Sequence, residues 1–450
     1  MRPESLARLR AQHGGALVTV ATRLIDLPCR YGMHLLIALR LPLAEVGAFY
    51  IVYGVMTIAG GLGRMGVDRA LTREMARVLA VGDVHAARSA MFRAFRLVGA
   101  MSLGLTLVAL ALAWPLATLI LRKPDLTALF LVGALTIIPL NMSSVAAGAL
   151  AGLHKVTLSQ IVYTWLWPAL FCLTVLLIPM NAANALLAIA FGMVGATVIG
   201  CGMLYAAMPR AVADAPRVAP APLFGIGASL FSAEFVQLLI SAAPTFALGV
   251  FAPTAEAGLY AIAWRVVLVI YMFVSSVSSM VSPRFARLYA LDDKLGLQRE
   301  AAKALGFALT LAIIPILVVS IEAVRILQLF GTSYAAADST LRILLVGQLA
   351  VTLTTTTPEL LGMTGYARAL FRLNLGAFSV LVVGCTVFTP QMGADGAALA
   401  VSGTMVFNAI GATLVARKRL GFFPLGALYA SLRGRSQAAA SASPTASGVH

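Results

Sequence analysis

Four ionisable side chains lie close together inside the first apolar segment of the chain. Residues 16–39 are apolar enough to cross a bilayer, yet they contain Arg23, Asp26, Arg30 and His34. At about 100° of rotation per helical residue, these positions fall within an arc of about 80° and form one polar stripe. Ionisable groups at membrane depth are costly and face a protein interior or a water-filled cavity. The stripe therefore predicts a hydrophilic cavity within the membrane.

A second apolar segment, residues 223–250, carries a matching polar stripe. Adding 211 to the four positions gives Glu234, Gln237, Ser241 and Thr245, all of which are polar. We expect these two segments to be helices that line one shared cavity. In this interpretation His34, Ser241 and Thr245 are further cavity-lining residues.

The composition indicates a membrane protein. The 450 residues are 60% hydrophobic and 11% charged, and the mean hydropathy is +0.93, whereas about a quarter of the residues in soluble domains are charged. The net charge of +16 does not indicate nucleic-acid binding, because the basic residues are scattered between apolar segments. The four cysteines lie singly within apolar segments, which favours buried thiols over a disulfide or a metal site.

Apolar segments near the length of about 20 residues that crosses a bilayer recur about twelve times in the sequence. The polar residues 1–15 before the first segment lead us to expect no cleavable signal peptide. The predicted spans are residues 16–39, 45–67, 95–121, 126–150, 158–180, 183–208, 223–250, 255–281, 300–320, 338–362, 367–389 and 395–416.

Lysine and arginine are unevenly distributed between the two sets of loops. Of the 33 basic residues, 25 fall on one side and three within spans, and five fall on the other side: Arg40, Arg122, Lys123, Arg325 and Arg342. Because cytoplasmic loops carry the excess of Lys and Arg, we expect both termini to be cytoplasmic and the number of spans to be even.

The two halves of the chain align without gaps. The segment Ala44-Glu45-Val46-Gly47 matches Ala255-Glu256-Ala257-Gly258 at an offset of 211, the offset that also superimposes the polar stripes. We predict six-helix halves at 1–208 and 223–416, a cytoplasmic linker at 209–222, and a disordered cytoplasmic tail at 417–450. Parallel repeats of this kind place a transporter's substrate site between the halves near the midplane, although six-span repeats also occur in scaffolds.

The repeated motifs carry a family resemblance. The run LRLPLAEVGAFY, followed by Gly63, Gly66, Asp68 and Arg73, resembles bacterial polysaccharide flippases, as do GVFAPTAEAGLYAIAWRV, LFGTSYAAADSTLRIL, MGADGAALA and RKRLGF. These O-antigen and exopolysaccharide transporters belong to the multidrug/oligosaccharidyl-lipid/polysaccharide exporter superfamily. The resemblance covers about residues 16–421. It implies an all-α, V-shaped, alternating-access bundle in the bacterial inner membrane. That bundle would translocate a lipid-linked oligosaccharide of the undecaprenyl-pyrophosphate type for lipopolysaccharide or exopolysaccharide synthesis.

Such a cargo requires fixed cations that replace the water around its phosphates. Arginine suits this role because its planar fork binds phosphate oxygens bidentately and stays charged. The candidates are Arg23, Arg30 and Arg265, the last in the eighth span. The candidates for coupling transport to H⁺ or Na⁺ are Asp26, Glu234 and Gln237. An alternative interpretation is structural, since Asp26 stands at helical ion-pair spacing from both Arg23 and Arg30.

Two other classes of membrane protein fit the sequence less well than a flippase. A multidrug or organic-cation exporter of the same superfamily would favour acidic, aromatic-lined cavities, whereas the stripes hold two Arg, one Asp and one Glu. A polymerase or ligase enzyme would need a large periplasmic loop, and no nucleotide loop, metal cluster or nucleophile–base pair is present in the sequence. We therefore expect no catalytic residues, no bound metal and no cofactor. The expected partners are membrane lipids, the lipid-linked oligosaccharide and a polysaccharide polymerase with its chain-length regulator.

Overall fold

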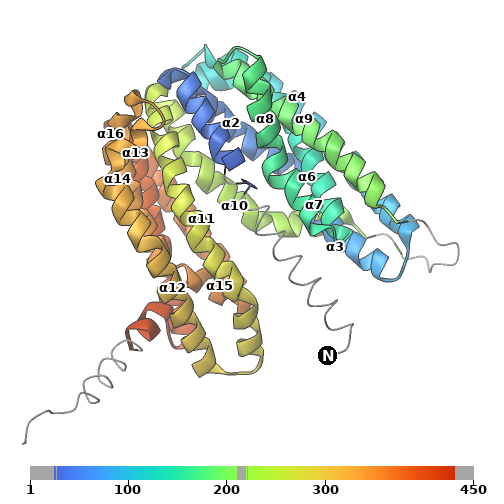
Figure 1. Cartoon of the computed structure of the whole chain (residues 1–450), viewed down its shortest axis with the longest axis vertical. Helices are drawn as coiled ribbons and strands as arrows, with labels where there is room; N and C mark the ends of the chain where they lie inside the picture. The colour runs from blue at the N-terminus through green and yellow to red at the C-terminus, as the bar shows by residue number, and fades with distance from the viewer. Residues whose placement is uncertain (1–24, 27, 210–218, 220, 431–450) are drawn as a thin grey trace, which may run out of the picture. The chain divides into compact units, whose positions relative to one another are not determined.

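The computed structural model of the chain describes residues 25, 26, 28–209, 219 and 221–430, and regular structure among them is entirely helical (Figure 1). The first helix is described at residues 25–26 and 28–40. It is followed by α2 (Leu43–Arg64), α3 (Val67–Ala80), α4 (Val84–Pro115), η1 (Leu116–Ile120), α5 (Leu126–Ala134), α6 (Ile137–Gly152), α7 (Val156–Gln160), η2 (Ile161–Trp165), α8 (Leu166–Leu177), α9 (Ala182–Ala207), α10 (Leu223–Phe251), α11 (Thr254–Ala290), α12 (Lys294–Ile321), α13 (Ala323–Gln328), η3 (Thr332–Ala337), α14 (Asp338–Leu353), α15 (Thr356–Met363) and α16 (Ala367–Leu420). The predicted all-α fold is confirmed.

Ten helical stretches among the described residues are long and apolar enough to cross a membrane. One of them, α16, contains two of the predicted spans. Its backbone breaks at Gly393, whose φ of 55° and ψ of −126° are not helical, between the predicted segments 367–389 and 395–416. The predicted first span lies partly outside the described residues. The predicted set of spans therefore matches the helices closely, and what differs is where individual helices end.

The outer surface of the helices is apolar and part of the interior is polar. On α4, Leu103 and Leu107 are 52% and 57% exposed, whereas Ser102 on the same helix is fully buried. Ser102 Oγ accepts a hydrogen bond of 2.8 Å from Nδ2 of the buried Asn141 on α6. A helix with exposed leucines and a buried serine is suited to lipid on one side and protein on the other.

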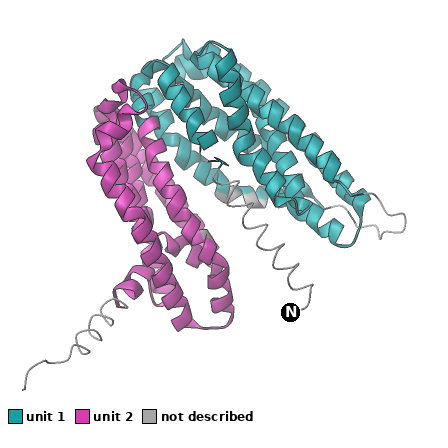
Figure 2. Ribbon diagram, viewed as in Figure 1, with its two compact units in different colours: residues 1–261 teal, residues 262–450 magenta. Residues whose placement is uncertain are grey.

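The chain forms two compact units, Met1–Ala261 and Ile262–His450, shown in different colours in Figure 2. In the first unit α10 packs against α2 and α3, and α6 packs against α3, α4 and α9. In the second, α16 packs against α14 and α15. The boundary falls 39 residues beyond the predicted linker because α10 lies with the first unit. The predicted halves 1–208 and 223–416 were defined by the sequence repeat and not by contacts, so this division stays a prediction.

Two glycines from the repeated motif contact each other's helix reciprocally. A Cβ atom on Gly47 of α2 would overlap the carbonyl oxygen of Thr254, and one on Gly258 of α11 would lie 2.7 Å from the carbonyl oxygen of Leu43. The offset of 211 exchanges the two contacts, since Leu43 corresponds to Thr254 and Gly47 corresponds to Gly258. The contact is therefore two-fold symmetric, and it requires glycine on both helices.

A sharp bend separates α2 from α3. Met65 and Gly66 adopt consecutive left-handed conformations, with φ values of 41° and 69°. These two residues end α2 and redirect the chain into α3. The apolar segment predicted to end at residue 67 therefore continues, after this bend, as the separate helix α3. The bend places Arg64 and Arg69 on either side of one corner.

Candidate functional site

The predicted polar stripe of the first helix is described from Asp26 onwards. The Nε atom of Arg30 lies 3.3 Å from Oδ1 of Asp26, one helical turn earlier. The side chain of Arg30 is 39% exposed, and its Nη atoms have no ion-pair or hydrogen-bond partner among the described residues. The ion pair expected from the spacing is thus present, and it engages a single edge of the guanidinium. Arg23 lies outside the described residues.

His34, on the same stripe, is buried and joined to α2. Its Nδ1 atom lies 2.8 Å from the hydroxyl of Tyr50. The His34 ring is 5.8 Å from the Tyr50 ring, which in turn stacks edge-to-face on Phe49. This contact orients the imidazole from a neighbouring helix and ties the first helix to α2.

Glu234 lies at the centre of a charged cluster. Its Oε1 atom is 2.8 Å from Nη2 of Arg64, and its Oε2 atom is 3.0 Å from Nη2 of Arg69. Each carboxylate oxygen is therefore paired with a different arginine: Oε1 accepts a hydrogen bond from Arg64, and Oε2 forms an ion pair with Arg69. The partners come from the α2–α3 corner. No ion pair between Glu234 and the first helix occurs among the described residues.

Arg64 is the buried member of this cluster, with 9% of its side chain exposed. Its Nη1 atom donates to Ser144 Oγ on α6 at 3.2 Å, and its Nε atom lies 3.9 Å from Oδ2 of Asp68. That last distance is an ionic contact and too long for a hydrogen bond. Arg64 Nε and Asp68 Oδ1 are buried without a hydrogen-bond partner among the described residues. The two arginines and two carboxylates make a cluster of zero net charge.

Close backbone packing brings the cluster together. A Cβ atom on Gly66 would lie 2.5 Å from the carbonyl oxygen of Gly227 on α10, and one on Gly227 would lie 2.7 Å from that of Met65. On the other side of α3, a Cβ on Gly148 of α6 would lie 2.6 Å from the carbonyl oxygen of Asp68. Glycines thus let α10 and α6 approach the α2–α3 corner closely enough for Arg64 to bridge them.

The far end of α10 is held to the same unit by Lys123. Its Nζ atom donates to the carbonyl oxygens of Gly249 at 2.5 Å and Ala252 at 2.6 Å. These are orphan carbonyls at the C-terminus of α10, where a cation is also favoured by the helix dipole. Burial lowers the pKa of Lys123 below its usual range. Arg64 and Arg69 at Glu234, and Lys123 at the C-terminal end, thus hold α10 at two separate points.

The remaining predicted residues lie in varied surroundings. On α10, Gln237 and Ser241 are exposed and Thr245 is half-buried. Arg265 is half-buried on the part of α11 that belongs to the second unit. No group of three or more His, Cys, Asp or Glu side chains suited to a metal occurs in the described part of the chain. The assignment of all these residues to cargo or ion binding stays a prediction.

The family of the chain follows from its sequence. A family model described as polysaccharide biosynthesis protein matches residues 36–337, about two thirds of the chain. The chain belongs to this family, which confirms the resemblance found in its motifs. No protein of curated function matches the sequence.

Solved structures of similar fold are membrane transporters. An inward-facing multidrug resistance MATE family transporter of the MOP superfamily matches with a TM-score of 0.71 and 15% identity, covering 90% of this chain and 98% of that one. The lipid II flippase MurJ in an inward closed conformation matches with a TM-score of 0.70 and 12% identity, covering 94% and 93%. A MOP superfamily transporter from Pyrococcus furiosus matches with a TM-score of 0.60 and 16% identity, covering 90% and 93%. The chain therefore has the fold of this superfamily.

Proposed function

We propose that this protein is a flippase that moves a lipid-linked oligosaccharide across the inner membrane by alternating access, during surface polysaccharide synthesis. The fold alone does not separate this role from drug export, because the MATE transporter and the MurJ flippase match equally well. Membership of a polysaccharide biosynthesis family favours a glycan cargo. In this proposal the protein is a transporter with no catalytic step.

The observation that carries the proposal is the state of Arg30. Its single partner among the described residues, Asp26, engages Nε and leaves both Nη atoms available. A guanidinium in this state presents two N–H donors on one edge, the arrangement that binds phosphate oxygens bidentately. Asp26 then serves to orient the side chain. Arg23 and Arg265 stay further candidates for phosphate binding.

An exporter of organic cations is the second candidate, and the pairing of the candidate carboxylates with arginines argues against it. An organic cation would be stabilised by carboxylates and aromatic faces. The two carboxylates nearest to this role are already occupied: Asp26 contacts Arg30, and both oxygens of Glu234 are paired with arginines. A cationic cargo would have to displace these partners.

Coupling to H⁺ or Na⁺ is proposed to involve Glu234. Its oxygens are held by Arg64 and Arg69, so an ion would bind only in a conformation that separates α10 from the α2–α3 corner. Glu234→Gln should then remove the dependence of transport on pH or Na⁺ in vesicles. An unchanged dependence would exclude Glu234 as the coupling residue.

Export in cells tests the proposed cargo site. In a strain lacking its own copy, Arg30→Ala should abolish surface polysaccharide while the protein stays in the membrane, and Arg30→Lys should restore it in part. Arg40→Ala is the matched control, because Arg40 is exposed at the end of the same helix. Normal polysaccharide with Arg30→Ala would remove Arg30 from the cargo site.

A further inference from the structure

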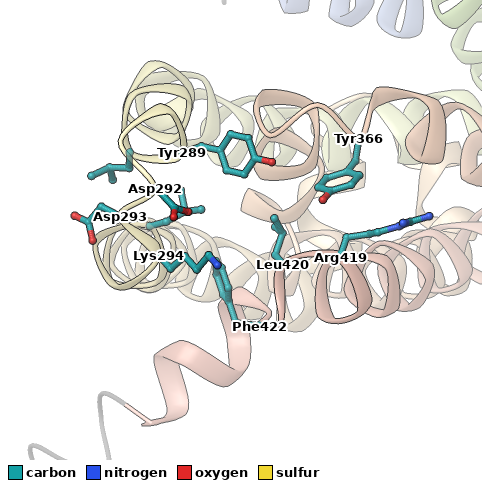
Figure 3. Close-up of a pocket in the computed structure, with 10 residues that line it drawn as sticks. Tyr289, Asp292, Asp293, Lys294, Tyr366, Arg419, Leu420 and Phe422 are labelled. Carbon is teal, nitrogen blue, oxygen red and sulfur yellow. The ribbon is translucent and has the colours of Figure 1, made fainter.

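A pocket of about 480 Å³ lies in the second unit, where the end of α11, the start of α12 and the end of α16 meet (Figure 3). Its volume is in the range of about 300–1,000 Å³ that is typical of small-ligand sites. The pocket lies apart from the polar stripe and the charged cluster in sequence, and neither role described above uses it. Its lining residues are Leu288, Tyr289, Asp292, Asp293, Lys294, Leu297, Tyr366, Arg419, Leu420 and Phe422.

The lining combines opposite charges with aromatic rings. Figure 3 shows the rings of Tyr289 and Tyr366 on one side of the gap and Lys294 on the other, with Asp292 between the helices. The guanidinium of Arg419 lies 5.8 Å from the centre of the Tyr366 ring. Neither Lys294 nor Arg419 forms an ion pair with a carboxylate among the described residues. A ligand that carries both a phosphate and an ammonium group would satisfy both signs of charge.

Asp292 lies at a left-handed position that few residue types other than glycine, asparagine and aspartate adopt. It has a left-handed φ of 51° in the turn that leads into α12, while Asp293 caps that helix by accepting from the backbone N–H of Gly296 at 2.8 Å. In the corresponding turn of the first half, the left-handed residue is Gly82 and the cap is Asp83, which accepts from Ala86 at 2.8 Å. The turn of the first half forms without a side chain at this position, and the Asp292 carboxylate has no hydrogen-bond or ion-pair partner among the described residues.

The pocket lies at the ends of three helices that are candidate membrane spans. It joins the end of the candidate span Thr254–Ala290, the start of Lys294–Ile321 and the end of Ala367–Leu420. Leu291 and Leu295 beside it are 66% and 65% exposed, and apolar and aromatic side chains of this kind are favoured at the membrane interface. Leu297 and Phe422 supply an apolar wall.

We propose that this pocket binds the headgroup of a zwitterionic phospholipid carrying a primary ammonium, as in phosphatidylethanolamine. Lys294 and Arg419 hold the phosphate, Asp292 accepts hydrogen bonds from the ammonium, and the tyrosine rings flank it. A purely anionic headgroup would meet the carboxylates of Asp292 and Asp293 unfavourably. The inference needs only that the chain spans a membrane, so its test is independent of the cargo.

Lipid retention tests the pocket. The full chain is placed in nanodiscs of phosphatidylcholine with small, equal amounts of phosphatidylethanolamine and phosphatidylglycerol, re-extracted in detergent, and its bound lipids are measured by mass spectrometry. We expect enrichment of phosphatidylethanolamine, and a reduction of about tenfold for Asp292→Asn, as expected when a charge-assisted hydrogen bond is lost. Asparagine tolerates the left-handed conformation. Lys294→Gln should also reduce the enrichment of phosphatidylethanolamine, because it removes a cation that holds the phosphate.

Lys418→Ala is the matched control, because Lys418 is an exposed neighbour of Arg419 that does not line the pocket. It should keep the enrichment of the unmodified protein. Soluble phosphoethanolamine should compete for the site, and inorganic phosphate should compete far less. Equal retention of phosphatidylglycerol, equal competition by inorganic phosphate, or retention unaffected by Asp292→Asn and Lys294→Gln would each overturn the proposal.

Discussion

The Nη2 atom of Arg64 lies 2.8 Å from Oε1 of Glu234, which is 170 residues away in the chain. The pair is largely buried, and it joins the α2–α3 corner to α10. Removing one partner of a buried pair leaves the other charge without compensation, which costs about 3–5 kcal/mol. This bond therefore makes the position of α10 sensitive to single substitutions.

Arg64→Ala and Arg69→Ala should have very different effects, although both arginines bind the same carboxylate. Arg64 is 9% exposed and Arg69 is 56% exposed. We expect a loss of about 3–5 kcal/mol for Arg64→Ala and of less than about 1 kcal/mol for Arg69→Ala. The midpoint of thermal unfolding in detergent measures both. Equal losses would show that burial of Arg64 does not determine its contribution.

The all-helical fold and most spans could be predicted, because apolar length and Lys/Arg asymmetry are strong local signals in a membrane protein. The pairing of Asp26 with Arg30 could also be predicted, since it spans one helical turn. The partners of Glu234 could not. In the sequence, Arg64 and Arg69 are two of the 25 basic residues assigned to the cytoplasmic side, and nothing marks them as partners of Glu234. Their location depends on the left-handed bend at Met65 and Gly66 and on the approach of α10 at Gly227, which no sequence periodicity records.

Gly66→Ala and Gly82→Ala separate steric overlap from backbone strain. Both glycines have left-handed φ values, of 69° and 81°, but a Cβ on Gly82 meets nothing within 4 Å. We expect Gly82→Ala to cost about 1–2 kcal/mol, the strain of the left-handed conformation. Gly66→Ala should cost about 1–3 kcal/mol more, because it also overlaps the backbone of α10. Similar unfolding midpoints for the two variants would contradict the close packing of Gly66 on Gly227.

Gly47→Ala and Gly258→Ala should each destabilise the protein by about 1–3 kcal/mol or more, because each introduces a methyl group against the partner helix's backbone. The control is Gly104→Ala in α4, where a Cβ meets nothing within 4 Å. That change should be neutral or stabilising by up to about 1 kcal/mol, since alanine favours helix. Thermal unfolding of the three variants checks the reciprocal contact, and a harmless Gly47→Ala would rule it out.

Lys123→Met should loosen the end of α10. It removes the donor that binds the carbonyl oxygens of Gly249 and Ala252, at an expected cost of about 1–3 kcal/mol. Lys155→Met, at an exposed position, should change stability by less than about 0.5 kcal/mol. Faster amide hydrogen exchange at residues 245–252 in the Lys123 variant alone would support the anchor. Identical exchange in both variants would count against it.

Translocation in reconstituted vesicles tests the proposed function most directly. The purified protein is placed in liposomes that carry a labelled polyprenyl-pyrophosphate oligosaccharide in one leaflet, and a membrane-impermeant glycosidase reports its arrival in the other. We predict faster arrival than in protein-free liposomes, abolished by Arg30→Ala and kept by Arg40→Ala. Arrival no faster than in protein-free liposomes, together with uptake of organic cations by the same vesicles, would contradict a lipid-linked oligosaccharide cargo.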